Sequence, residues 1–167
     1  MATHAYSQVF VRSHSIVFFS DSMHTALREL IRENGLDPDK LMQEWATIER
    51  GVRTWLDSGH LNNIVVEFYT PWSSVASARW DFPVGYGGSG VDDDMWLDKD
   101  YLRKLIAKSA RPTRDCIYRI LLCTDAGAPA VSGFTSCSFL GTGRLSARQA
   151  GTVIATGHMT AGITYWK

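Results

Sequence analysis

The sequence predicts a single α+β domain over residues 1–167, and three observations point to that class. Apolar residues recur at helical spacing in three stretches, and other segments alternate apolar and polar residues as strands do. The C-terminal part keeps its aromatic residues but shows no sustained helical period. With 45% hydrophobic residues, the chain is long enough to bury one core. We therefore expect three helices, at least four strands and a long C-terminal arm.

The N-terminal part of the chain predicts a strand and then a helix. Residues 5–12 alternate polar and apolar side chains in the manner of a short strand. Between residues 13 and 34, apolar side chains recur every three or four positions, which indicates an amphipathic helix. Gly35 is expected to end this helix, because glycine adopts the left-handed conformation without a Cβ clash.

A second amphipathic helix is expected between residues 37 and 59. Asp37 is a natural N-cap, and Pro38 suits the first helical position. The apolar stripe of this helix comprises Leu41, Trp45, Ile48, Val52 and either Trp55 or Leu56. Such a stripe predicts a helix central to the core.

Two strands are expected next, over residues 61–70 and 75–86. In the second strand, Arg79 and Asp81 alternate with apolar residues and are expected to face solvent. Pro83 lacks a backbone N–H, which favours an edge position or the end of the strand.

The remaining elements are a third helix, a further strand and the arm. The helix is expected over residues 97–110, with Asp98 as its cap. Residues 115–124 form a mostly apolar run, which predicts a strand at the centre of the sheet. The arm, residues 125–167, is rich in small residues yet carries aromatic ones, so we expect it to fold onto the core rather than act as a linker.

Charge and cysteine content argue against several protein classes. Lys plus Arg and Asp plus Glu both number 17, so direct binding of nucleic acid or an acidic membrane is not expected. Three cysteines without a CxxC pair argue against a disulfide framework or a zinc site and favour a reducing cytoplasm. The longest N-terminal apolar run, residues 16–19, is too short for a signal peptide or a membrane span.

The stretch "GGSGVDDDMW", residues 87–96, raises the possibility of a phosphate or metal site, because glycine-rich loops cradle phosphate and carboxylates bind Mg²⁺ or Ca²⁺. It lacks the P-loop pattern and the EF-hand spacing. The other interpretation of Asp92, Asp93 and Asp94 is an acidic lead-in to the third helix. A metal-dependent phosphoryl-transfer enzyme that uses these three aspartates is therefore kept as the alternative function.

Other candidate chemical groups give no catalytic pattern. The histidines have no metal-ligand spacing; they are His4, His14, His24, His60 and His158. Cys137 would need His158 or His60 as a base to act as a nucleophile, and nothing in their spacing favours that. No catalytic residue, metal or cofactor is expected from these observations.

Five stretches together make the sequence resemble the HORMA domain, in the bacterial branch found in CBASS antiphage operons. They are "LRELIRENGLDPDKLMQEWATIERGVRTWLDSGHLNNIVVEFY", "ARWDFPVGYGGSG", "YRILL", "GFTSCSF" and "AGITYWK". The resemblance covers nearly the whole chain. It implies a HORMA-like fold, with an antiparallel sheet packed on three helices. It also implies a core of about residues 1–124 and a C-terminal safety belt of about residues 125–167.

The resemblance also implies a function. HORMA domains are not enzymes but peptide-binding conformational switches, whose safety belt wraps a short closure-motif peptide in the closed state. In the bacterial systems the closed protein activates a cGAS-like nucleotidyltransferase, and an AAA+ ATPase opens it by engaging the N-terminal segment. The implied partners are thus a peptide, a nucleotidyltransferase and an AAA+ ATPase, in the cytoplasm. A structural adaptor with a fixed arm is a further alternative.

Site residues follow from the same resemblance. The residues expected to bind the closure peptide are Tyr101, Tyr118, Leu121, Phe134, Phe139, Tyr165 and Trp166. Those expected to engage the ATPase are Thr3, His4, Ala5 and Tyr6. The aspartates at 92–94 are expected beside the peptide groove, where they would favour basic peptides.

Overall fold

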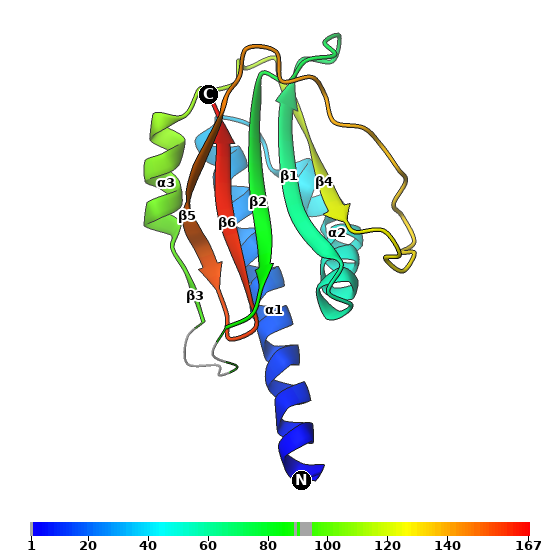
Figure 1. The fold of residues 1–167 in the computed structure, drawn as a ribbon. Coiled ribbons are helices and arrows are strands. Elements are labelled where there is room, and N and C mark those ends of the chain that lie inside the picture. Colours follow the sequence, from blue (N-terminus) through cyan, green and yellow to red (C-terminus); the bar gives the residue numbers. More distant parts are fainter. Residues whose placement is uncertain (1, 89, 91–94) are drawn as a thin grey trace.

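The computed structural model describes residues 2–88, 90 and 95–167, with side chains from Arg12 onward. Figure 1 shows the path of the chain through its helices and strands. In chain order these are α1 (Ala2–Glu33), α2 (Asp39–Asp57), β1 (Leu61–Tyr69), β2 (Ala78–Tyr86), β3 (Trp96–Leu97), α3 (Lys99–Lys108), β4 (Ile117–Thr124), β5 (Ala147–Ala155) and β6 (Met159–Trp166).

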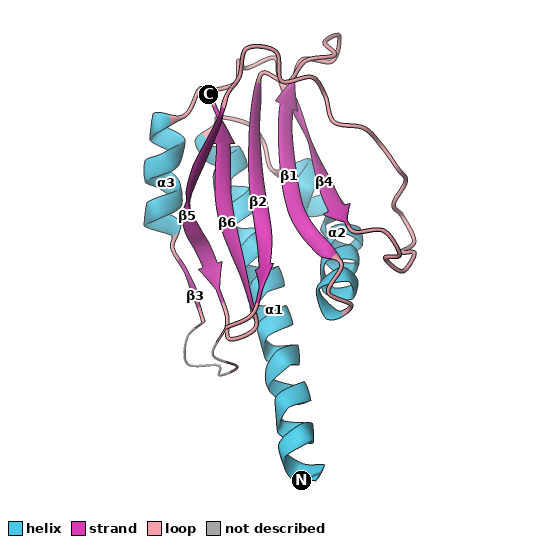
Figure 2. Ribbon diagram, viewed as in Figure 1, coloured by secondary structure: helices cyan, strands magenta, loops and turns pink. Residues whose placement is uncertain are grey.

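The described strands form one sheet in the order β3-β5-β6-β2-β1-β4, and each neighbouring pair of strands is antiparallel. Figure 2 shows α1 and α2 behind this sheet and α3 beside β5. α1 contacts both other helices, and α2 packs against β1 and β4. This arrangement confirms the predicted α+β class, with an antiparallel sheet on three helices.

The core lies between α1 and the helix-facing side of the sheet. Phe19, Met23 and Leu27 of α1 are fully buried, and they belong to one apolar cluster with Phe68 and Trp80 of the sheet. Burying a side chain of this size contributes about 1.5–3 kcal/mol before entropy is counted. The helical spacing that predicted α1 and α2 therefore marks the faces that the core uses.

The predicted strand at residues 5–12 is wrong, because α1 already begins at Ala2. A strand needs a neighbour for its backbone hydrogen bonds, whereas a helix formed at residues 13–33 extends one residue at a time along its own chain. Figure 1 shows the N-terminal end of α1 projecting beyond the sheet. The start of α2 differs by one residue from the prediction: Asp39 is its first residue, and Asp37 Oδ1 accepts the Asp39 N–H at 2.8 Å.

The apolar run at residues 115–124 forms β4, but β4 lies at an edge of the sheet and not at its centre. An apolar run predicts burial on both faces of a strand, and that inference holds in part. Tyr118 and Leu121, which face opposite sides of β4, are both buried. The loop of the arm covers the face that helices leave open.

Two further expectations for β2 are wrong. Arg79 and Asp81 are not solvent-facing but are 8% and 7% exposed, because they form an ion pair under the arm. Pro83 does not lie at an edge, since β2 pairs with β1 and β6. Gly162 of β6 faces this proline, and its missing side chain leaves room for the ring in an interior strand.

The arm has two parts. Residues 125–146 form an irregular loop, which we call the arm loop, and β5 and β6 then make a hairpin that pairs with β2. Figure 1 shows the arm loop leaving the end of β4, running beside it and crossing above β1 and β2 to reach β5. The prediction that the arm folds onto the core is thus confirmed.

Candidate functional site

A groove lies between the free edge of β4 and the arm loop, with a volume of about 510 Å³. β4 has no strand neighbour on this side among the described residues. The lining residues come from α2, β4 and the arm loop: Trp55, Ile120, Leu121, Leu122, Cys123, Thr124, Ala128, Pro129, Ala130, Val131, Phe134, Thr135, Ser136, Cys137 and Phe139.

The arm loop is fixed first on the helix-facing side of the sheet, where it packs against α2. Trp55 Nε1 donates to the Pro129 carbonyl at 2.7 Å, and Arg50 Nη2 donates to the Ser132 carbonyl at 2.9 Å. The Phe134 ring meets Trp55 edge to face, with 5.0 Å between ring centroids. It can approach α2 this closely because Gly51 has no side chain: a Cβ there would lie 2.6 Å from Phe134 Cζ.

The arm loop is fixed a second time on the opposite, outer face of the sheet. Glu67 of β1 is fully buried and accepts from Arg119 Nε at 2.6 Å and from the Leu140 N–H at 2.8 Å. Arg119 also donates from Nη2 to the Ser138 carbonyl at 2.6 Å. Between its contacts with α2 and these contacts, the arm loop therefore passes around the free edge of β4.

Arg79 connects the arm loop with the C-terminal strand. Its guanidinium group lies 4.3 Å from the ring centroid of Phe139 and 4.8 Å from that of Trp166. Asp81 binds the same guanidinium group through two hydrogen bonds, of 2.8 and 3.0 Å, and accepts from Trp166 Nε1 at 3.2 Å. Both parts of the arm thus rest on one buried ion pair of β2.

The backbone of β4 presents hydrogen-bonding groups to the groove. Lys40 Nζ donates to the Tyr118 carbonyl at 3.2 Å, so this carbonyl points away from β1. Backbone groups alternate in direction along a strand, and those of Ile120 and Leu122 therefore point the same way, into the groove. An extended chain placed in the groove would pair with them.

Most side chains that line the groove are apolar, its polar side chains include Thr124, Thr135 and Ser136, and none of its lining residues is charged. Cys123 on its wall is half-buried, and burial raises the pKa of its thiol, with the nearby Asp81 carboxylate adding to the rise. A raised pKa keeps this thiol protonated and weakly nucleophilic. The described residues contain no group of three or more His, Cys, Asp or Glu that would hold a metal ion.

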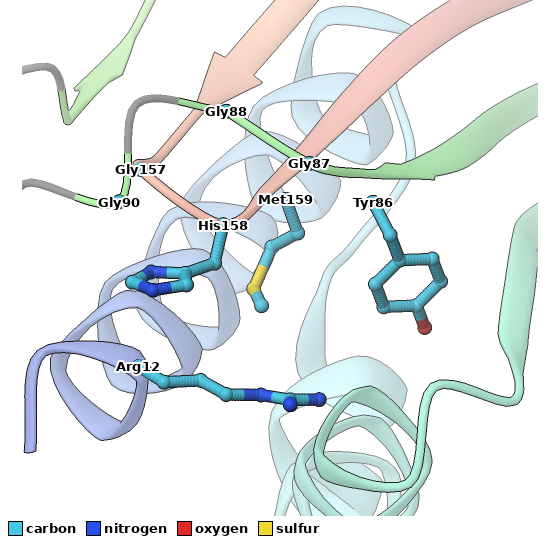
Figure 3. A pocket seen from close by; sticks show the side chains of 8 residues that line it. All are labelled: Arg12, Tyr86, Gly87, Gly88, Gly90, Gly157, His158 and Met159. Carbon is cyan, nitrogen blue, oxygen red and sulfur yellow. The ribbon is translucent and has the colours of Figure 1, made fainter. Parts of the chain in front are cut away.

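A smaller pocket of about 310 Å³ lies where α1, the end of β2 and the β5–β6 turn meet, and Figure 3 shows the side chains around it. Its polar groups already have partners. Arg12 Nη2 donates to the Asp57 carbonyl at 2.9 Å, and Tyr86 donates to the Leu61 carbonyl at 2.7 Å. His158 Nδ1 and Ser15 Oγ lie 3.0 Å apart. These contacts tie α1 to the C-terminal end of α2 and to the arm.

Comparison with protein families matches residues 4–167 to "Bacterial HORMA domain 2". The chain belongs to this bacterial HORMA family. A search of curated proteins finds no match.

Solved structures show the same HORMA fold at low sequence identity. A chain of the "Mitotic Checkpoint Complex" aligns with a TM-score of 0.73 at 10% identity, covering 91% of this chain and 97% of that one. Caenorhabditis elegans HTP-2 "bound to HIM-3 closure motif" aligns with a TM-score of 0.61 at 14% identity, covering 93% and 91%. A chain of the Escherichia coli MS115-1 "HORMA:CdnC:Trip13 complex" aligns with a TM-score of 0.58 at 16% identity, covering 93% and 89%.

Three of the seven residues expected to bind peptide in this HORMA domain line the groove: Leu121, Phe134 and Phe139. The other four lie elsewhere. Tyr101 on α3 accepts the Gly151 N–H at 2.8 Å, far from β4 in the sheet order, and Tyr118 binds the Asp37 carbonyl under α2.

The last two of these expected residues lie on β6. Tyr165 stacks on Trp80 in the core, 5.4 Å between ring centroids, and Trp166 packs on Arg79. These two residues were expected because they are aromatic residues of the arm that the resemblance implies, and aromatic character does not distinguish core packing from groove lining.

Sequence reasoning missed Trp55 and Cys123 as groove residues. Trp55 belongs to the apolar stripe of α2, where core packing was the simpler explanation, although its position beside Gly51 hints at a close neighbour. Cys123 ends an apolar strand and carries no further signal. Cys137, considered as a nucleophile, lies on the groove wall, whereas His60 bonds Ser58 and His158 bonds Ser15.

The remaining expected residues are only partly described. Thr3, His4, Ala5 and Tyr6 fall in the first turns of α1, and their side chains lie outside the described part of the structure. Asp92, Asp93 and Asp94 are outside the described residues altogether. Their described neighbour Trp96 belongs to β3, at the sheet edge opposite β4, and the expectation that the three aspartates favour basic peptides beside the groove stays a prediction. No helix in the described range is long and apolar enough to cross a membrane.

Proposed function

We propose that this HORMA domain is a peptide-binding switch whose arm, residues 125–167, acts as a safety belt over a core of residues 1–124. One observation carries the proposal: the arm loop passes from the helix-facing side of the sheet to the outer face around a free strand edge, and it encloses a groove without charged lining residues. That path is what a closed safety belt requires. The C. elegans relative was solved with a closure motif, which supports the same role here.

The groove suits an extended peptide that adds to β4 as a further strand. The outward N–H and C=O groups of Ile120 and Leu122 would pair with its backbone, and side chains on its two faces would meet the two walls. A free strand edge is otherwise a liability for aggregation, and a captured peptide would satisfy it.

The E. coli complex supports the rest of the proposal, because it contains a HORMA protein together with CdnC and Trip13. We propose that the peptide-bound form of this chain activates a cGAS-like nucleotidyltransferase in antiviral second-messenger signalling. An AAA+ ATPase then reopens the arm by pulling on the N-terminal end of α1. In this scheme the chain is a cytoplasmic binding protein and not an enzyme.

A groove-filling variant tests the proposal. Cys137 lies on the groove wall and is exposed, so Cys137→Trp fills the groove without entering the core. Ala107→Trp, at an exposed position of α3 outside the groove, is the matched control. Each tagged protein would be purified from its native lysate, separated by size exclusion and analysed by mass spectrometry.

The wild type and Ala107→Trp are expected to carry a peptide segment and to co-purify a nucleotidyltransferase or an AAA+ ATPase, with two separable conformers. Cys137→Trp is expected to lose the peptide and the nucleotidyltransferase. If all three proteins give one conformer and the same set of partners, the switch is refuted.

A further inference from the structure

We infer that the peptide held in this groove has a continuous uncharged apolar run of about five residues, supplied by a disordered segment of its parent protein. The inference rests on the proposed function and names the class of peptide. It differs from the usual expectation for strand addition, in which apolar and polar side chains alternate because one face of the added strand meets solvent.

The length of the run follows from β4. The strand contributes Ile120, Leu121, Leu122, Cys123 and Thr124 to the groove, which is five consecutive residues. Strand pairing matches residues one to one across a ladder, so about five residues of the peptide lie inside the groove.

Both faces of the added strand would be covered. On the helix-facing side the peptide meets Leu122, Trp55 and Phe134. On the outer side it meets Leu121 and Phe139, where the arm loop closes over the sheet. Strands covered on both faces consist of near-continuous apolar residues, and the same physical reason applies to a peptide in this position.

The buried charges beside the groove are already paired, and Lys40, which bonds the Tyr118 carbonyl, lies beyond the five β4 residues that line the groove. Glu67 is neutralised by Arg119, and Asp81 by Arg79, each within 2.8 Å. A charged peptide side chain would therefore lose its hydration without gaining a partner, which is costly. Lysine, arginine, aspartate and glutamate are expected outside the five-residue run and not within it.

An apolar run of this length is normally hidden inside a folded protein. The peptide must therefore come from a tail or another segment without a fold of its own. A random-peptide library displayed on phage and selected on the full chain tests the inference directly. The expected result is enrichment of peptides with an uninterrupted apolar run, from which the four charged residue types are depleted.

Variants that add a charge to the groove wall provide a second test of the inferred peptide class. Ser136→Arg adds a cation to the groove wall at an exposed position, and it is expected to shift the enriched peptides toward an acidic residue. Ser136→Asp is expected to shift them toward a basic one, and Ala107→Arg, on α3 outside the groove, to change nothing. In the selected peptide that binds the wild-type protein most tightly, replacing a central residue by Asp is expected to weaken binding by at least about 100-fold.

The results of the selection distinguish the inferred class of peptide from the proposed peptide-binding function. Enriched peptides that carry charges in the run, or that alternate apolar and polar residues, would refute this inference and leave peptide binding intact. A library that yields no enriched peptide on the wild type would refute both this inference and the proposed function.

Discussion

Glu67 is a carboxylate without exposed surface, and it holds the arm loop to the outer face through Arg119 and the Leu140 N–H. A buried charge of this kind is stable only while its partners stay in place. Opening the arm therefore means leaving Glu67 with fewer partners, and this residue favours the closed arrangement.

Glu67→Gln keeps the shape of the side chain but removes its charge. We expect it to cost about 1–3 kcal/mol of unfolding free energy, because Arg119 is left beside a neutral amide. We also expect faster trypsin cleavage at Arg144 in the arm loop. Urea unfolding and mass spectrometry of the digest measure both effects.

Glu29→Gln is the matched control, since Glu29 pairs with Arg103 and their side chains are 17% and 47% exposed. Because Arg103 is half-exposed, solvent screens this pair, and we expect it to contribute about 1 kcal/mol or less. If Glu67→Gln and Glu29→Gln behaved alike in both assays, Glu67 would not hold the arm.

At the scale of elements, α2 and the arm loop are fitted to each other at Gly51. A glycine inside a helix costs about 1 kcal/mol relative to alanine, so its presence in α2 calls for a reason. The reason is the Phe134 ring, which occupies the place of the missing side chain. The helix thus gives up stability at one position to seat the arm loop.

Gly51→Ala is expected to preserve helix content while displacing Phe134 and weakening binding of a selected peptide by about tenfold or more. Circular dichroism and fluorescence anisotropy measure these quantities. The double variant Gly51→Ala/Phe134→Leu should recover part of the affinity, because the smaller side chain makes room for the new methyl group. Unchanged affinity in the single variant would mean that Phe134 does not shape the groove.

The helices and strands differ in how well the sequence predicted them. Helical stripes such as that of Leu41, Ile48 and Val52 identified α2, because periodic burial leaves a clear pattern. The β5–β6 hairpin left almost none, since Gly151 and Gly162 interrupt the alternation and the register shifts within β5. The position of β4 was mispredicted because an apolar run reports burial and not the identity of the neighbour that buries it.

Only part of the candidate site was predicted, because a sequence pattern reports burial and not the neighbour that causes it. Phe134 and Phe139 stood out as aromatic residues in a polar arm, so their contact with the core was foreseeable. Glu67 and Arg79 look like ordinary strand residues in the sequence. Their burial depends on where the arm returns, which is a property of the tertiary structure.

At the scale of the whole molecule, the two edges of the sheet differ in the segments that lie beside them. At one edge, the two residues of β3 pair with the end of β5, and α3 lies beside the rest of β5, where Tyr101 accepts the Gly151 N–H at 2.8 Å (Figure 1). The β4 edge is longer and is surrounded by the arm loop, which is anchored on both faces of the sheet. The fold thus directs strand addition to one edge.

Cutting the arm loop tests whether this enclosure retains the peptide. A protease site inserted after Gly127, in the turn where the Ala128 N–H bonds the Asp125 carbonyl, would open the loop without removing any groove residue. Dissociation of a bound peptide is expected to accelerate by about tenfold or more after cleavage, because affinity differences appear mainly in dissociation rates. Stopped-flow fluorescence measures the rate before and after cleavage.

The same site inserted beside Trp72, which is 77% exposed in the β1–β2 connection, is the control. Cleavage there is expected to leave the dissociation rate unchanged. Equal rates for cut and uncut arm loops would show that contacts alone, and not enclosure, retain the peptide.

The double anchoring of the arm loop has a topological consequence. A peptide inside it would be threaded through a closed loop of protein, so a parent protein with folded domains on both sides of the peptide would be interlocked with this chain. Such a partner could not slide free however weak its contacts were, and it could not enter an arm that was already closed. Loading and unloading would then require the arm to detach, whereas a peptide at a free chain end could still pass through.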